Sequence, residues 1–168
     1  FWCTEAIFKR LRGVSEVISG YSGGSMENPD YDSVSVGSTG HAEVIQIKFD
    51  PKIISYEKLV EIFFHLHDPT TLNRQGNDVG TQYRSAIFYH SDQQKKVAEA
   101  VRKRIEDEHI YPNPIVTEIV QFENFYKAEA DHQNFYENNP DYGYCRIIID
   151  PKIKKLFGEF KNEVKESA

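Results

Sequence analysis

Several short segments of the chain alternate apolar and polar residues with a period of two, the pattern of a β-strand with one buried face. The clearest is His41–Phe49, where Asp50-Pro51 stops the alternation. The segments that predict strands are Val14–Tyr21, His41–Phe49, Ser85–Tyr89 and Ile115–Phe122.

Other segments repeat apolar residues at the spacing of a helix. Thr4 is expected to cap the first helix and Gly13 to end it, and Ser91 or Asp92 is expected to cap a charged helix. The predicted helices are Thr4–Arg12, Ser55–His67, about Gln93–Glu108, Phe125–Tyr136 and Pro151–Lys165.

Three polar segments lie between these elements and read as loops. Met26–Gly40 is rich in Gly, Ser, Asn, Asp and Pro and is expected to be mostly irregular. Asp68–Arg84 is a long polar loop, and Asn138–Tyr144 is a shorter one. A long loop in a compact domain is usually functional or disordered, so Asp68–Arg84 is a first place to look for a site.

Helices alternate with strands, and two strands are adjacent near the start of the chain. This order predicts an α+β fold, a two-layer α/β sandwich with helices on an antiparallel or mixed sheet. A strand upstream of Phe1 would complete a ferredoxin-like βαββαβ core. The length of 168 residues is enough for one domain with a core of its own, so we expect a single domain over residues 1–168.

Composition and charge narrow the class of protein. The net charge is −6 and no basic patch stands out, which argues against nucleic acid as a partner. No apolar run approaches the roughly 18 residues of a membrane helix. No signal peptide is visible, so a cytoplasmic location is the default expectation. We also expect a monomer. Phe1-Trp2-Cys3 reads as the middle of a longer chain rather than as a start.

The two cysteines, Cys3 and Cys145, are too few for a disulfide scaffold of this size. Cys3 lies at a predicted helix start, where the positive end of the helix dipole favours the thiolate. Cys145 follows Tyr142-Gly143-Tyr144, and a cysteine in such a loop can be mobile, as a resolving thiol must be. Two incidental buried thiols remain an equally good interpretation of the residues alone.

Other candidate residues for chemistry lie in a strand and in the long loop. Glu43 is two residues into a strand, and a carboxyl buried there among aromatic rings would have a raised pKa and could act as an acid. Arg74–Arg84 combines two glycines with many hydrogen-bonding side chains, as in a loop folded back on itself. A solvated strand glutamate and a flexible surface turn are the plainer alternatives.

Metal and serine-nucleophile sites find little support. His65 and His67 are two residues apart on a predicted helix, so their side chains point in different directions. No nucleophile elbow of a serine hydrolase is present. We therefore expect neither a metal nor another cofactor.

Taken together, the segments resemble peptide methionine sulfoxide reductase A along nearly the whole chain. The matching stretches are Phe1-Trp2, Ser19–Gly24, Tyr31, Thr39–Glu43, His67-Asp68-Pro69, Gly76–Asp78, Gly80–Ser85 and Ala128–Gln133. The family signature is Gly-Cys-Phe-Trp and its Cys is the nucleophile, so the resemblance places that Cys directly before Phe1. Cys3 follows Phe-Trp and is not at the nucleophile position, although it remains a fallback thiol.

The resemblance implies a role for each candidate residue. The cysteine attacks the sulfoxide sulfur of methionine-S-sulfoxide, free or in proteins, while protonated Glu43 supports the sulfoxide oxygen. Tyr31 and Tyr83 hold the same oxygen, and Asp78 orients polar groups nearby. Phe1 and Trp2 cage the substrate methyl group. Cys145, in Gly-Tyr-Cys, resolves the sulfenic acid as a disulfide, which a thioredoxin-like dithiol then reduces.

Two alternatives stay open on the sequence. The chain could be a module that binds methionine sulfoxide without turnover. It could also be a general thiol–disulfide oxidoreductase that uses Cys3 and Cys145.

Overall fold

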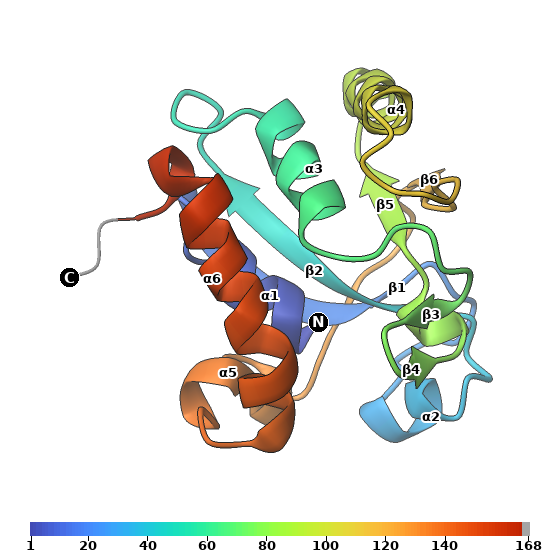
Figure 1. The fold of residues 1–168 in the computed structure, drawn as a ribbon. Helices are drawn as coiled ribbons and strands as arrows, with labels where there is room; N and C mark the ends of the chain where they lie inside the picture. The colour runs from blue at the N-terminus through green and yellow to red at the C-terminus, as the bar shows by residue number, and fades with distance from the viewer. Residues whose placement is uncertain (166–168) are drawn as a thin grey trace. The chain divides into compact units, whose positions relative to one another are not determined.

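The computed structural model describes residues 1–165 and combines helices with small β-sheets, as the α+β prediction requires. The chain folds into two compact units. The first unit contains Phe1–Gly20, Val44–Ser55 and the segment from Lys127 onward, and the second contains Tyr21–Glu43 and Tyr56–Tyr126. Figure 1 labels the elements of both units.

The first unit begins with helix α1 (Trp2–Phe8), which leads through a turn into strand β1 (Val14–Ser22). Gly13 makes this turn with φ of +89°, a conformation that costs other residues more than glycine. A Cβ there would lie 2.9 Å from side-chain atoms of Ile53 and Ile54, so this position also needs a residue without a side chain. Strand β1 lies between β2 (Ala42–Phe49) and the short β7 (Tyr126–Lys127) in a three-stranded sheet.

The C-terminal part of the first unit is helical and closes on the α1–β1 turn. Its elements are η2 (Ala130–His132), α5 (Phe135–Asn138), the π-helical turn η3 (Cys145–Ile149), α6 (Asp150–Glu159) and η4 (Lys161–Glu163). The backbone N–H of Arg12 donates to the carbonyl of Glu163 at 2.7 Å, and Leu11 forms an isolated bridge with Val164. These bonds fix the last described residues against the turn.

The second unit is built around a parallel pair of strands joined by a long helix. Strand β5 (Ala86–Tyr89) pairs with β6 (Glu118–Gln121) from Ala86 opposite Glu118 to Tyr89 opposite Gln121, and α4 (Asp92–Asp107) connects them. Helix α3 (Tyr56–His65) packs against α4, as Figure 1 shows. The core between these two helices consists of Val60, Phe64, Val101 and Ile105.

The second unit also contains the polar segments that the sequence presented as loops. Within 26–40 there is a short helix, α2 (Tyr31–Ser35), and Asp30 caps it in a reciprocal pair with Ser33. Within 68–84 the strands β3 (Arg74–Gln75) and β4 (Asp78–Val79) form a small antiparallel hairpin, followed by η1 (Thr81–Tyr83). Residues 26–40 are thus mostly irregular, as predicted, but the prediction missed this short helix.

Several predicted boundaries are wrong for identifiable reasons. Helix α1 starts at Trp2, so Thr4 is inside the helix and does not cap it, and the helix ends at Phe8. The predicted helix Phe125–Tyr136 is divided among β7, η2 and the start of α5. The Ala128 N–H donates to Ser19 O at 2.9 Å beside the sheet, and Asn134 takes a left-handed conformation with φ of +53°, which interrupts a continuous helix. The last helix ends at Glu159 rather than Lys165.

Two predictions about the fold, the ferredoxin-like core and the single domain, stay predictions. The ferredoxin-like βαββαβ core needs a strand upstream of Phe1, and the single domain over 1–168 is not decided by the division into two units. Within residues 1–165, no helix is long and apolar enough to cross a membrane.

Candidate active site

The second unit brings together four of the residues that the sequence singled out. Tyr31 begins α2, Glu43 lies in β2, Asp78 in β4, and Tyr83 ends η1. The pKa of Tyr83 is raised to about 12, mainly by burial and to a smaller extent by the nearby Glu43, Tyr31 and Asp78, because a negative charge on any of them opposes a tyrosinate. Four residues distant in sequence therefore form one cluster, with a tyrosine that stays protonated at neutral pH.

Gln82 fixes the η1 turn to the end of α2. Its side-chain Nε2 donates to the carbonyl of Ser35 at 3.0 Å, and its side chain is almost completely buried. The Gln82 amide fits against Gly80, where a Cβ would come within 2.3 Å of the amide oxygen. Glycine at position 80 thus lets Gln82 hold Tyr83 in place relative to Tyr31.

His41 anchors the start of β2, the strand that carries Glu43, to the loop that follows β1. The His41 ring is 1% exposed; its Nδ1 accepts from the Gly24 N–H at 2.9 Å and its Nε2 donates to the Met26 carbonyl at 2.7 Å. Both ring nitrogens are therefore used to hold the loop after β1 against the start of β2. Glu43 follows two residues later in β2, so its backbone lies next to this anchored end of the strand.

The long loop that carries Asp78 and Tyr83 is closed by a buried polar chain at its base. His67 precedes this loop and Ser85 follows it, and the His67 Nε2 and Ser85 Oγ atoms are 2.7 Å apart. Ser85 Oγ lies 2.7 Å from Thr117 Oγ1 in the neighbouring strand segment. The two ends of the loop are thereby held together, which limits the positions that its catalytic candidates can take.

The first unit holds the aromatic candidates Phe1 and Trp2. The Trp2 indole N–H donates to Nδ1 of His132 at 3.1 Å, and the indole stacks on Phe135 with ring centroids 3.8 Å apart and planes 7° apart. The Phe1 ring lies 5.7 Å from the ring of His132, and Tyr144 meets Trp2 edge-on. His132 and Phe135 therefore orient the ring that the sequence assigned to the substrate methyl group.

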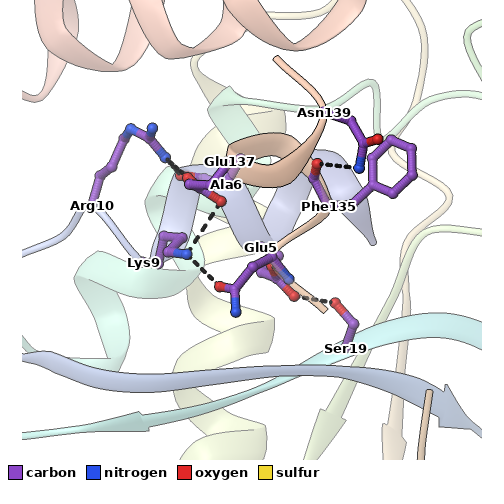
Figure 2. Close-up of polar contacts among 9 residues, drawn as sticks. Glu5, Ala6, Lys9, Arg10, Ser19, Phe135, Glu137 and Asn139 are labelled. Carbon is purple, nitrogen blue, oxygen red and sulfur yellow. Dashed lines mark hydrogen bonds and ion pairs between the residues drawn. The ribbon is translucent and has the colours of Figure 1, made fainter. Parts of the chain in front are cut away.

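Glu5 is a buried carboxyl of α1 that the sequence did not single out. It is 2% exposed and accepts from the Ser19 hydroxyl at 2.6 Å and from the Asn134 N–H at 2.5 Å. Figure 2 shows Glu5 between these elements. Because both oxygens of the buried carboxylate accept hydrogen bonds, Glu5 fixes α1 against β1 and against the segment that leads into α5.

A cluster of charged residues joins the end of α1 to α5. Lys9 Nζ donates to the Asn134 side-chain oxygen at 2.5 Å and lies 3.2 Å from Glu137, and Arg10 lies 3.0 Å from the other oxygen of Glu137. Figure 2 shows both basic side chains directed at this carboxylate. The ion pairs are partly exposed, so their individual energies are small, but together they set the position of α5 on α1.

Cys3 and Cys145 both belong to the first unit, as free thiols. Cys145 is fully buried in an apolar cluster with Ala6 and Ile149, and Cys3 packs against this cluster. Burial raises the pKa of the Cys145 thiol, and the charges of Asp150 and Glu137 raise it further. Cys145 begins the helical η3 turn and packs against α1 rather than lying in an open loop, and its mobility stays a prediction.

We compared the chain with protein-family models and with known proteins to identify its family. The family model described as peptide methionine sulfoxide reductase matches residues 1–165. The chain belongs to this family. A relative from Sulfolobus acidocaldarius, named peptide methionine sulfoxide reductase MsrA, is 55% identical over 97% of this chain and 92% of its own length. An MsrA from Polynucleobacter asymbioticus is 51% identical over 96% of this chain and 85% of its own.

Solved structures of the family agree. The reduced form of Mxr1 from Saccharomyces cerevisiae matches with a TM-score of 0.81 and 36% identity, over 86% of this chain and 83% of its own. Methionine sulfoxide reductase A of Corynebacterium diphtheriae matches with a TM-score of 0.75 and 34% identity, over 87% of this chain and 73% of its own. These structures support the α+β assignment of the chain.

The family was predicted correctly from the sequence, whereas several supporting residues of the site were not. The resemblance found on the motifs is confirmed, and the comparisons favour neither a binding module nor a general thiol–disulfide oxidoreductase. The supporting residues His41, Gln82, Glu5 and His132 were assigned no role. His41, Gln82 and His132 lie inside stretches that the family resemblance quoted, so their place in a family motif was the available signal.

Proposed function

We propose that this chain reduces methionine-S-sulfoxide, free or in proteins, to methionine, with a cysteine directly before Phe1 as the nucleophile. The observation that carries the proposal is the cluster of Tyr83 with Glu43, Tyr31 and Asp78, in which Tyr83 has a pKa of about 12. A tyrosine that stays protonated near two carboxyl groups is a hydrogen-bond donor for an oxygen that becomes more negative during the reaction.

In the first step the cysteine sulfur bonds to the sulfoxide, and oxygen passes from the substrate sulfur to the cysteine. Methionine leaves, and the cysteine becomes a sulfenic acid, so substrate sulfur is reduced as cysteine sulfur is oxidised. Glu43, in its protonated form, donates to the sulfoxide oxygen, and Tyr31 and Tyr83 donate to the same oxygen. Asp78 orients polar groups nearby.

Phe1 and Trp2 enclose the substrate methyl group. The support for this is the fixed orientation of the Trp2 ring, which His132 holds through the indole N–H and Phe135 through stacking. A rigid aromatic surface next to the nucleophile recognises a methyl group by apolar contact. An R-epimer would exchange the positions of methyl and oxygen, which provides a physical basis for epimer selection.

In the second step the thiol of Cys145 condenses with the sulfenic acid, forming a disulfide and releasing water. A thioredoxin-like dithiol then reduces this disulfide by thiol–disulfide exchange. The dithiol supplies the two electrons and is itself oxidised to a disulfide. Because Cys145 is fully buried and its pKa is raised, η3 has to open before this thiol reacts. The reaction draws its electrons from thiols and requires no metal or other cofactor.

The remaining expectations form part of the proposal. We infer one functional domain over residues 1–168, a monomer in the cytoplasm, and a ferredoxin-like core completed by a strand upstream of Phe1. The partners are methionine sulfoxide and a thioredoxin-like reductant.

The test compares the chain that carries cysteine directly before Phe1 with the same chain carrying serine there. Each is given a peptide with S- or R-methionine sulfoxide and a dithiol, and methionine formation is followed while calorimetry measures peptide binding. We expect methionine from the S-epimer with the cysteine form alone, and binding by both forms. Binding by both without methionine from either would instead support a binding module.

A further inference from the structure

Cys3 and Cys145 lie in the same apolar cluster of the first unit. Cys145 packs with Ala6 and Ile149, and Cys3 packs against this group. Cys3 and Ala6 are three residues apart on α1 and so lie on the same face of the helix. Since η3 contacts α1, the fold brings both thiols to one face of this helix.

We propose that Cys3 is a second resolving thiol, which takes over the disulfide from Cys145 and presents it to the external dithiol as a Cys3–Cys145 disulfide. This inference rests on the proposed function, because the disulfide it acts on arises from the sulfenic acid of the cysteine before Phe1. It assigns to Cys3 a step that the sequence left open.

The step is one thiol–disulfide exchange. The Cys3 sulfur, as the thiolate, attacks the sulfur of Cys145 in the first disulfide. The bond between Cys145 and the nucleophilic cysteine breaks as the Cys3–Cys145 bond forms, and the proton released by Cys3 ends on the freed nucleophile. No net oxidation occurs, since one disulfide replaces another. The external dithiol supplies the two electrons that later reduce the Cys3–Cys145 bond.

Leaving-group chemistry favours attack at Cys145 rather than at the nucleophile. In thiol–disulfide exchange the thiol with the lower pKa leaves faster. Cys145 has a raised pKa because it is buried and lies near Asp150 and Glu137, so Cys145 is the poorer leaving group. An attacking Cys3 therefore keeps Cys145 and expels the nucleophile, which returns to its reactive form.

The two cysteines differ in solvent exposure, and this difference affects which disulfide an external reductant can reach. Cys145 is fully buried, whereas Cys3 is partly exposed. A disulfide that includes Cys3 is thus more accessible to a protein reductant than the first disulfide. A disulfide needs Cα atoms roughly 4.4–6.8 Å apart, and the packing of Cys3 against the cluster of Cys145 places the two thiols in the same region of the first unit.

The number of methionines formed without any reductant tests the proposal. The first turnover gives the nucleophile–Cys145 disulfide, the exchange frees the nucleophile, and a second sulfoxide is then reduced. The parent chain, with cysteine before Phe1, should form about two methionines per chain, and both Cys3→Ser and Cys3→Ala should form about one. Non-reducing peptide mapping of the parent should show Cys3 linked to Cys145.

Steady-state rates provide the matched comparison. With thioredoxin as reductant, Cys3→Ser should turn over at least roughly tenfold more slowly than the parent, while a small dithiol should drive both at similar rates because it reaches the first disulfide directly. One methionine per chain from the parent, with Cys3 free in the oxidised protein, would overturn the role of Cys3. No methionine from any form would instead refute the proposed function itself.

Discussion

The Nδ1 atom of His41 accepts a hydrogen bond from the backbone N–H of Gly24 at 2.9 Å, and this bond joins the loop after β1 to the start of the strand that carries Glu43. The approach is close enough that a Cβ on Gly24 would lie 2.4 Å from the His41 backbone nitrogen and 2.5 Å from the Thr39 carbonyl oxygen. The position of the proposed acid therefore depends on a residue without a side chain, seventeen residues before His41.

Gly24→Ala should therefore reduce both stability and activity. The added methyl group meets backbone atoms that cannot rotate away, and overpacking of this kind typically costs about 1–3 kcal/mol. Denaturant unfolding should show a loss of that order. Gly158→Ala is the matched control, because a Cβ there meets nothing within 4 Å inside α6, and it should be neutral or stabilising by up to about 1 kcal/mol. Equal stability of the two variants would contradict the close packing at Gly24.

Tyr83→Phe should change the alkaline absorbance titration of the folded protein. Tyr83, Tyr56 and Tyr136 each have a pKa of about 12, which burial raises in Tyr83 and Tyr56 and the hydrogen bond to Asp150 raises in Tyr136. The variant should lose the amplitude of one tyrosine near pH 12 and keep the amplitude near pH 10. Because the folded-state pKa is raised above the usual 10, protonated Tyr83 favours folding below pH 10, and this contribution disappears as pH rises from 10 to 12. Loss of amplitude near pH 10 instead would show that Tyr83 is not shielded.

Glu43→Gln should slow the formation of the sulfenic acid and leave peptide binding nearly unchanged. A positioned acid typically contributes about 10²–10⁴-fold to a rate, and glutamine keeps the shape without the transferable proton. Rapid-quench measurement of methionine in a single turnover gives the rate, and calorimetry gives the affinity. Asp107→Asn, at the end of α4, is the control for loss of a carboxyl elsewhere in the same unit. An unchanged single-turnover rate in Glu43→Gln would remove Glu43 from the mechanism.

His132→Ala should disturb the Trp2 ring, which is the only tryptophan of the chain. Loss of the acceptor leaves the indole N–H without this bond, so the fluorescence of Trp2 should shift and its quenching by a soluble quencher should increase. The KM for a sulfoxide peptide should rise by roughly fivefold, because one neutral hydrogen bond contributes about 1 kcal/mol to the orientation of the ring. Unchanged fluorescence and KM would show that stacking on Phe135 alone orients Trp2.

The elements of regular structure that bury one face could be predicted from the sequence. The strand Ala42–Phe49 and the helices Tyr56–His65 and Asp92–Asp107 follow from clear alternation or helical spacing, and Ser91 caps the last of these with its side chain accepting from the Gln94 N–H. Local signals suffice there, because each segment exposes one face to water and buries the other.

Segments fixed by distant partners could not be predicted. Residues 125–136 have helical spacing, but the Gln133 side chain binds both the N–H and the carbonyl of Ser19, and this pairing holds the segment along β1. The helix Tyr31–Ser35 escaped notice because five residues carry too little periodicity, although its Asp30 and Ser33 caps are readable.

The candidate site shows the same division. The candidate residues Glu43 and Cys145 came from the family resemblance, and their roles stay predictions. The burial of Cys145 could not be predicted, because it depends on contacts of η3 with α1, more than a hundred residues away in sequence.

The most direct measurement of the central claim is a single turnover by the Cys145→Ser variant of the chain with cysteine directly before Phe1. Given a peptide with S-methionine sulfoxide and no reductant, each chain should form about one methionine and gain the mass of one oxygen atom on the residue before Phe1. The R-epimer should give neither product. Methionine without added oxygen at that residue, or equal reaction with both epimers, would contradict the account.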